Sequence, residues 1–354
     1  MKGLLSKKVP LMIGLDIGTR FIKAVVIEKK KDEYTVHSAV CEPIHKEAFA
    51  EREIKDFEAV SLALRKVQKS LRTKLKDVVI GVSGSSVISK IVYMNPGQTD
   101  FELESQIEIE ADSLIPYPLE EVYLDFEELG PSNTHVGKVN ILLSAAHKDI
   151  VDSRLTLVRE IPFEPRVVDV EGYALGNAIS HFYDKSYSGQ ICCINLGASA
   201  LQVSVVKDNE VLYSKEHNFG MNMLLQDISM MHMMEKQDVE KGLIDGSLSD
   251  SWKTDTLPIF LANCQQQINR AIQMYTTTTH SPPPEKMLLT GGGACIPELV
   301  SALDKELDME VSAFNPFKNI AIGKNINTEL VNSLAPQFCI AAGLATRSFS
   351  PWHM

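Results

Sequence analysis

The sequence contains no run of about 18 apolar residues, the length that a membrane-spanning helix requires. Lys2, Lys7 and Lys8 precede an apolar stretch, as in a signal peptide, but Asp16 interrupts this stretch and no small-residue cleavage site follows. We therefore predict that the stretch is a first β-strand. The chain is expected to be soluble and not to insert directly into a membrane.

Basic residues are in the minority. The chain has 35 Lys and Arg residues against 46 Asp and Glu residues, which gives a formal net charge of -11. Proteins that bind nucleic acid neutralise backbone phosphates with clustered Lys and Arg side chains. Nucleic acid is therefore not an expected partner.

Paired cysteines and clustered histidines are also missing. The nine histidines form neither an HExxH motif nor a recognisable Ser/His/Asp arrangement, so metal-dependent hydrolysis and nucleophilic catalysis are not favoured. No CxxC pair or zinc-type spacing occurs, which indicates reduced and mostly buried thiols. The six cysteines are Cys41, Cys192, Cys193, Cys264, Cys295 and Cys339.

The length of 354 residues and the 44% hydrophobic content predict about two domains with sizeable cores. Residues 12–28 and 34–41 have strand patterns, and a polar turn separates them. Apolar residues then recur at helical spacing over 56–75, before a strand at 78–82. The chain therefore begins with a β-hairpin followed by a helix and a further strand.

A second module follows the break at Asn95-Pro96-Gly97. The pattern predicts a helix with Asp100 as its N-cap, two strands and a further helix, which together would form a small α+β unit. The expected domain limits are 1–184 for the first domain, with an inserted subdomain at about 98–165, and 185–354 for the second domain, with a helical subdomain at about 220–284.

The two halves of the chain contain similar segments. Placing Asp16-Ile17-Gly18-Thr19 over Asn195-Leu196-Gly197-Ala198 also aligns Ile22 with Leu201 and Val26 with Val205. Each segment has the pattern of a strand, a glycine turn and a second strand. We therefore expect the two halves to share one fold.

The glycine turns have the composition of phosphate-binding loops. Glycine lets the backbone approach an anion, and a carboxylate such as Asp16 can hold the water shell of Mg²⁺, with Lys23 adding a cation. On its own the first turn fits an ordinary hairpin equally well. The small residues Gly197, Ala198 and Ser199 suit a second phosphate loop. The segment 288–294 delivers three glycines between a strand and a helix, where a base and ribose can lie.

This order of motifs resembles the actin, sugar kinase and DnaK superfamily. The resemblance implies an α/β fold in which two RNase H-like domains close over ATP and Mg²⁺, here with an inserted α+β subdomain. The segments ESQIEIEADSLIPYPLEEVYLDFEELG, VVDVEGYALGNAI and AAGLATR resemble the PilM family of type IV pilus assembly proteins, and the first also resembles FtsA. The resemblance covers residues 11–347.

The resemblance implies a role in ATP binding for residues of the three turns and of the helical subdomain. Asp16 would coordinate hydrated magnesium. The implied nucleotide-binding residues are Asp16, Gly18, Thr19 and Lys23 at the first turn, Asn195, Gly197, Ala198 and Ser199 at the second, Gly291, Gly292 and Gly293 at the third, and Asp238 and Lys241 in the helical subdomain.

The chain departs from the superfamily pattern at Asn195, where an aspartate is usual. Asparagine has a similar shape but lacks the charge that helps to position magnesium and polarise water, so turnover should suffer more than binding. Asp16 and Glu171 are the candidate catalytic residues. Glu171 and Asp169 are acidic residues that could orient water, although a capping or domain-connecting role fits them at least as well.

The family resemblance implies an ATP-binding cytoplasmic scaffold, at most a weak ATPase, that is peripheral to the inner membrane. Its partner would be the cytoplasmic N-terminal peptide of the inner-membrane protein PilN, bound beside the inserted subdomain. Other pilus components and self-association are further possibilities. The alternatives are a small-molecule kinase, for which no catalytic base is recognisable, and an FtsA-like membrane tether, for which the tail RSFSPWHM offers no amphipathic helix.

Overall fold

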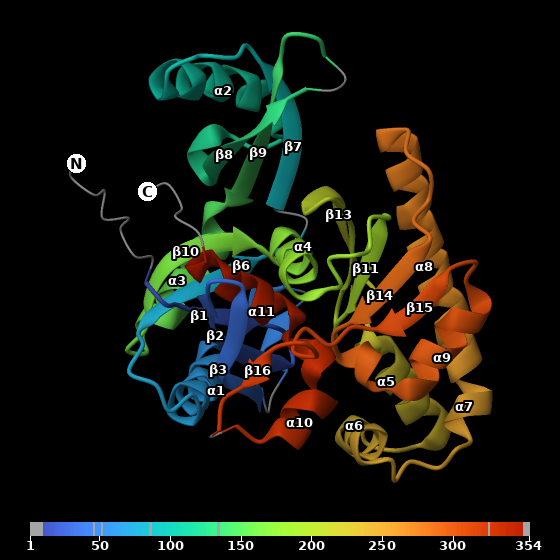
Figure 1. The fold of residues 1–354 in the computed structure, drawn as a ribbon. Helices are drawn as coiled ribbons and strands as arrows, with labels where there is room; N and C mark the ends of the chain where they lie inside the picture. Colours follow the sequence, from blue (N-terminus) through green and yellow to red (C-terminus); the bar gives the residue numbers. More distant parts are fainter. Residues whose placement is uncertain are drawn as a thin grey trace. The chain divides into compact units, whose positions relative to one another are not determined.

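The computed structural model describes residues 10–44, 47–50, 52–84, 87–132, 135–324 and 326–349. The chain divides into two compact units (Figure 1). We call Val82–Leu157 the inserted unit and the remainder, Met1–Gly81 with Val158–Met354, the main unit. Among the described helices, none is long and apolar enough to cross a membrane.

The first half of the main unit is built on a six-stranded sheet with the order β10-β6-β1-β2-β3-β16. The strand expected over 12–28 is in fact two strands, because the chain turns at Gly18 and the amide of Gly18 donates to the carbonyl of Phe21 at 3.1 Å. Helix α1 (Phe57–Ser70) begins where the Asp56 carboxylate accepts the amide of Ala59. The strands are β1 (Ile13–Ile17), β2 (Phe21–Lys30), β3 (Glu33–Pro43), β6 (Asp77–Val82), β10 (Glu164–Val170) and β16 (Ala321–Ile322), and a separate hairpin is formed by β4 (Phe49–Ala50) and β5 (Glu53–Ile54).

The second half repeats this plan in a five-stranded sheet with the order β13-β12-β11-β14-β15. In each half the first strand pairs antiparallel with the second and parallel with a later strand. The register also repeats, because Asp16 pairs with Lys23 and Asn195 pairs with Gln202. The predicted repeat is therefore confirmed. The strands are β11 (Ile191–Leu196), β12 (Leu201–Lys207), β13 (Glu210–His217), β14 (Lys286–Thr290) and β15 (Glu310–Ala313).

Helices of the second half pack around its sheet. The longest, α8, buries Phe260, Cys264 and Ile268 against the strands, as expected for an amphipathic helix. The methionines at and just after the end of α5 lie outside the core, because Met230, Met231 and Met233 are exposed. These helices are α5 (Met221–His232), α6 (Lys236–Asp245), α7 (Trp252–Asp255), α8 (Leu257–Thr279) and α9 (Pro297–Glu306). Helix α10 (Thr328–Ser333) follows β16, and its Val331 belongs to a core cluster that includes residues of both sheets.

Two helices with small residues, α4 (Glu171–Phe182) and α11 (Cys339–Ala345), pack closely together (Figure 1). A Cβ atom at Gly343 would lie only 1.7 Å from the carbonyl oxygen of Ala174 in α4. On its other side α11 contacts β1, where a Cβ atom at Gly14 would lie 2.0 Å from the carbonyl oxygen of Ala341. A side chain at Gly343 would therefore collide with α4, and a side chain at Gly14 of β1 would collide with α11.

The inserted unit is a three-stranded antiparallel sheet with the order β7-β9-β8, covered on one face by α2 (Figure 1). Leu103, Ile107 and Ala111 of α2 pack on alternate residues of the strands. The N-cap of α2 is Thr99 rather than Asp100, because Thr99 and Glu102 form a reciprocal capping box. The elements are β7 (Val87–Met94), α2 (Asp100–Leu114), β8 (Val122–Pro131), β9 (Val139–His147) and α3 (Lys148–Arg159).

The limits of this unit differ from the expected 98–165. The unit begins earlier because β7, which the sequence patterns did not assign, supplies an edge strand of its sheet. It ends earlier because β10 pairs within the six-stranded sheet of the main unit. A hydrogen-bonding partner, rather than a local break in the sequence, therefore determines where each strand belongs.

Replacing Gly343 by alanine should destabilise the main unit by about 3 kcal/mol or more, since the new methyl group would collide with backbone that cannot rotate away. Thermal or urea unfolding measures this loss. Gly292→Ala is the matched control, because a Cβ atom at Gly292 would meet no atom within 4 Å. Equal stability of the two variants would contradict the close packing of α4 and α11.

Candidate functional site

A cleft of about 490 Å³ lies in the main unit between its two halves, within the size range of small-molecule sites. It is lined by the turn after β1, the turn after β11, the glycine segment after β14 and one side of α6. These elements are the ones in which the sequence places its candidate residues. The lining includes ten of those residues: Asp16, Gly18, Thr19, Lys23, Asn195, Gly197, Ala198, Ser199, Gly291 and Gly292.

The two predicted phosphate turns face each other across the cleft. The hydroxyl groups of Thr19 and Ser199 lie 3.1 Å apart and share a hydrogen bond, although the residues are 180 positions apart in the sequence. Each turn is closed in the same way, since the amide of Gly197 donates to the carbonyl of Ala200 as that of Gly18 does to Phe21. Two equivalent turns therefore place small residues in the lining of the same cleft.

The third glycine segment opens toward the same cleft. Gly291 has a φ of +81°, and a Cβ atom there would lie 2.6 Å from the side-chain oxygen of Asn195, so both conformation and space call for glycine. A Cβ atom at Gly292 would meet nothing within 4 Å, which leaves a flat open surface. Gly293 is buried and does not line the cleft, because it packs on the side chain of Leu196.

Helix α6 faces the cleft with residues other than those expected. Glu240, Leu243 and Ile244 line it, whereas Asp238 and Lys241 do not. At about 100° per residue, positions 240, 243 and 244 share one side of a helix, and 238 and 241 point away from that side. The expected helix is therefore at the cleft, and a different side of it forms the wall.

Charged side chains are concentrated at the inner end of the cleft. Asp16 forms an ion pair with Lys23 at 2.8 Å, and Glu171 at the start of α4 lies nearby with a side chain only 3% exposed. Burial raises the pKa of Asp16, and the negative charge of Glu171 adds to this, while Lys23 opposes it. A cation that entered beside Asp16 would favour its ionised form.

Asp169 does not line the cleft. Its two carboxylate oxygens accept hydrogen bonds from Arg347 at 2.7 and 3.0 Å, which joins the end of β10 to the turn after α11. This pair links the two segments VVDVEGYALGNAI and AAGLATR. The domain-connecting interpretation of Asp169 fits this geometry, whereas Glu171 reaches the cleft.

Four charged residues of this region were missed by the sequence patterns. Arg20 and Glu240 form an ion pair across the cleft, in which the Nε atom of Arg20 donates at 2.8 Å. Arg52, from the β4–β5 hairpin, pairs with Glu216 of β13. Arg20 directly follows the first turn, so its position next to that motif could have identified it. Arg52, Glu216 and Glu240 belong to no motif.

Asp16 and Cys41 are residues of the cleft that bear on metal and thiol chemistry. Within the described residues, no group of three His, Cys, Asp or Glu side chains is placed to hold a metal ion. Asp16 alone suits magnesium, which commonly uses one or two carboxylates together with phosphate oxygens and water. Burial raises the pKa of Cys41, in the cleft wall, to about 12, so its thiol stays protonated.

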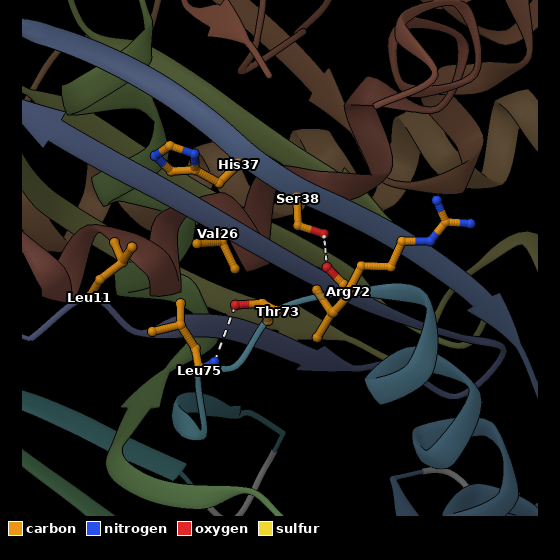
Figure 2. A pocket seen from close by; sticks show the side chains of 8 residues that line it. Leu11, Val26, His37, Ser38, Arg72, Thr73 and Leu75 are labelled. Carbon is orange, nitrogen blue, oxygen red and sulfur yellow. Dashed lines mark hydrogen bonds between the residues drawn. The ribbon is translucent and has the colours of Figure 1, made fainter. Parts of the chain in front are cut away.

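A second cavity, of about 300 Å³, lies between the segment that follows α1 and strands β2 and β3 (Figure 2). Leu11, Val26 and Leu75 line it, and the hydroxyl of Ser38 donates to the carbonyl of Leu71 at 3.1 Å. None of the candidate residues lines this cavity. The cleft is therefore the candidate functional site.

The ion pair of Arg20 and Glu240 should couple the two sides of the cleft by about 1 to 2 kcal/mol, since both side chains are mostly buried. A double-mutant cycle of Arg20→Gln and Glu240→Gln, followed by urea unfolding, measures this energy. The exposed pair of Arg166 and Asp77 is the control, and its coupling is expected to be much weaker because solvent screens it. Additive effects of Arg20→Gln and Glu240→Gln would contradict the geometry.

Known structures share this fold. The chain is similar to a chain of a PilM-PilN type IV pilus biogenesis complex, with 21% identity, a TM-score of 0.83, and coverage of 97% of this chain and 100% of that one. It is also similar to the ethanolamine utilization protein EutJ from Carboxydothermus hydrogenoformans, with 12% identity, a TM-score of 0.57, and coverage of 95% and 89%. It is similar as well to MreB5 of Spiroplasma citri bound to AMPPNP, with 11% identity, a TM-score of 0.50 and coverage of 95% of both chains. These likenesses establish the actin-like, two-domain α/β fold.

The family assignment comes from the sequence as a whole. A model of the family described as type IV pilus assembly protein PilM matches residues 14–349, which is nearly the full length of the chain. The match spans both sheets, the inserted unit and all three glycine turns. The chain therefore belongs to the type IV pilus assembly protein PilM family.

Proposed function

We propose that the chain is an ATP-binding scaffold of type IV pilus assembly that binds the cytoplasmic N-terminal peptide of PilN. It would work at the cytoplasmic face of the inner membrane, held there by this partner. The observation that carries the nucleotide part is the cleft in which the turns at Thr19 and Ser199 face each other. The family match favours pilus assembly over the FtsA-like and kinase alternatives.

The cleft offers a separate place for each part of ATP. The phosphates would lie between the turns at Gly18 and Gly197, with Lys23 as a cation, and Asp16 would hold magnesium through water. The adenosine would lie on Gly292, against the apolar wall formed by Leu243 and Ile244 of α6. Support for this placement comes from MreB5, a protein of the same fold whose structure contains AMPPNP.

The residues of the cleft favour holding ATP over hydrolysing it. Asn195 provides an amide where a carboxylate would help to position magnesium, and its side-chain oxygen lies 3.4 Å from the hydroxyl of Thr290. Glu171, the remaining acidic candidate, lies in an ion pair with Arg52 at 3.7 Å. ATP would then act as a ligand that stabilises one arrangement of the cleft.

The inserted unit offers a surface for the partner peptide. Ile91, Tyr93 and Tyr123 lie on the face of its sheet opposite α2 and are 42%, 40% and 46% exposed. The outer edges of β7 and β8 have no strand beside them in the described structure. An extended peptide can pair with such an edge and place apolar side chains on the adjoining face.

Calorimetry with a peptide of the PilN cytoplasmic N-terminus, with and without Mg-ATP, tests this proposal. We expect the peptide to bind, and the double substitution Ile91→Ser with Tyr93→Ser to weaken binding about 10-fold or more through loss of apolar contact. The matched control is Phe101→Ser with Ile109→Ser, which alters exposed apolar residues of α2 instead. Absence of peptide binding under both conditions would refute the scaffold proposal.

Asn195→Asp should raise ATP turnover by roughly 10-fold or more, because a carboxylate there helps to position magnesium and polarise water. Release of inorganic phosphate under saturating Mg-ATP measures the rate. Asn222→Asp, at another cleft position, is the control for an added negative charge. Unchanged turnover in Asn195→Asp would show that Asn195 does not limit hydrolysis.

A further inference from the structure

Arg52 is a cation in the cleft that no motif identifies. It lies at the turn between β4 and β5, and its side chain is only 18% exposed. Its guanidinium group donates to both carboxylate oxygens of Glu216, from Nε at 3.2 Å and from a terminal nitrogen. The β4–β5 hairpin of the first half is thereby joined to β13 of the second half.

The remaining nitrogen of the guanidinium group is less firmly held. It lies 3.7 Å from a carboxylate oxygen of Glu171, beyond hydrogen-bond distance, and no other contact to it is found among the described residues. Arginine has five N–H donors in a planar fork, and Glu216 uses one side of this fork. The other side remains able to donate to a further anion in the cleft.

The carboxylates around Arg52 would repel an anion that enters the cleft unless a cation stands beside them. Asp16, Glu171 and Glu216 are all mostly buried, and Lys23 is paired with Asp16. Burial opposes the charge of Arg52, but Glu171 and Glu216 outweigh it and raise the pKa of the guanidinium group. Without Arg52, a phosphate group would face the carboxylates of Glu171 and Glu216 uncompensated.

We infer that Arg52 binds the terminal phosphate of ATP and makes the cleft distinguish a nucleoside triphosphate from a diphosphate. This inference rests on the proposed nucleotide site and adds the residue that contacts the third phosphate. Because Arg52 also joins the β4–β5 hairpin to β13, binding of that phosphate would change the contact between the two halves of the main unit. A purely structural role for Arg52 would affect ATP and ADP alike.

Calorimetric titration of the full chain with Mg-ATP, Mg-AMPPNP and Mg-ADP tests this role. In Arg52→Gln we expect the affinity for the two triphosphates to fall by roughly 10- to 100-fold, because a charge-assisted hydrogen bond is lost and two carboxylates are unmasked. The affinity for ADP should change less than about 3-fold. Arg166→Gln, which removes an arginine from an exposed ion pair, is the matched control and should change neither affinity.

Two further variants keep the test decisive if Arg52→Gln does not fold. Arg52→Lys retains the charge but not the fork, and should lose part of the preference for triphosphate. Arg52→Gln combined with Glu216→Gln removes both charges of the pair and should lose the preference as well. Equal losses for ATP and ADP, or no loss, would overturn the inference, whereas failure of the unmodified chain to bind any of the three nucleotides would overturn the nucleotide site itself.

Discussion

The close packing of α4 against α11 is the constraint on which the main unit depends. Gly343 lies against the backbone of Ala174, and Gly14 of β1 lies against the other side of α11, so the two helices and the first strand have almost no freedom to shift. The pair of Asp169 and Arg347 joins the segments that lead into and out of these helices. This arrangement fixes the first turn of α4, and with it the position of Glu171 in the cleft.

The charges near Glu171 support the proposal that the cleft holds a polyanion and its metal ion. Asp16 with Lys23, and Glu171 and Glu216 with Arg52, place alternating charges in a region with little access to water. Such groups are costly to bury unless they are paired, and each pair here joins different strands or helices. A bound nucleotide would exchange some of these pairs for contacts with phosphate and magnesium, and could thereby alter how the halves are joined.

The repeat could be predicted from sequence because it rests on local patterns. The alignment of Asp16 with Asn195 correctly gave two turns with the same register, since strands and glycine turns leave a periodic signal. The side of α6 that lines the cleft could not be predicted in the same detail. Glu240 and Lys241 are neighbours in the sequence, and only the packing of the helix decides that Glu240 faces the cleft.

Long-range contacts were beyond the sequence patterns. Arg52 reaches Glu216 across 164 positions, and nothing near either residue marks the pair. Gly293 looked equivalent to Gly292, but the packing of Leu196 against it separates their roles. The start of the inserted unit likewise follows from the pairing of β7 with β9, and no local break in the sequence marks this start.

A crystal structure of the chain with Mg-AMPPNP tests the central claim, that the cleft holds ATP, most directly. The account predicts phosphates between the turns at Thr19 and Ser199, magnesium beside Asp16, and the adenine ring over Gly292 against Ile244. A nucleotide bound elsewhere, or a cleft that stays empty at saturating concentration, would contradict it.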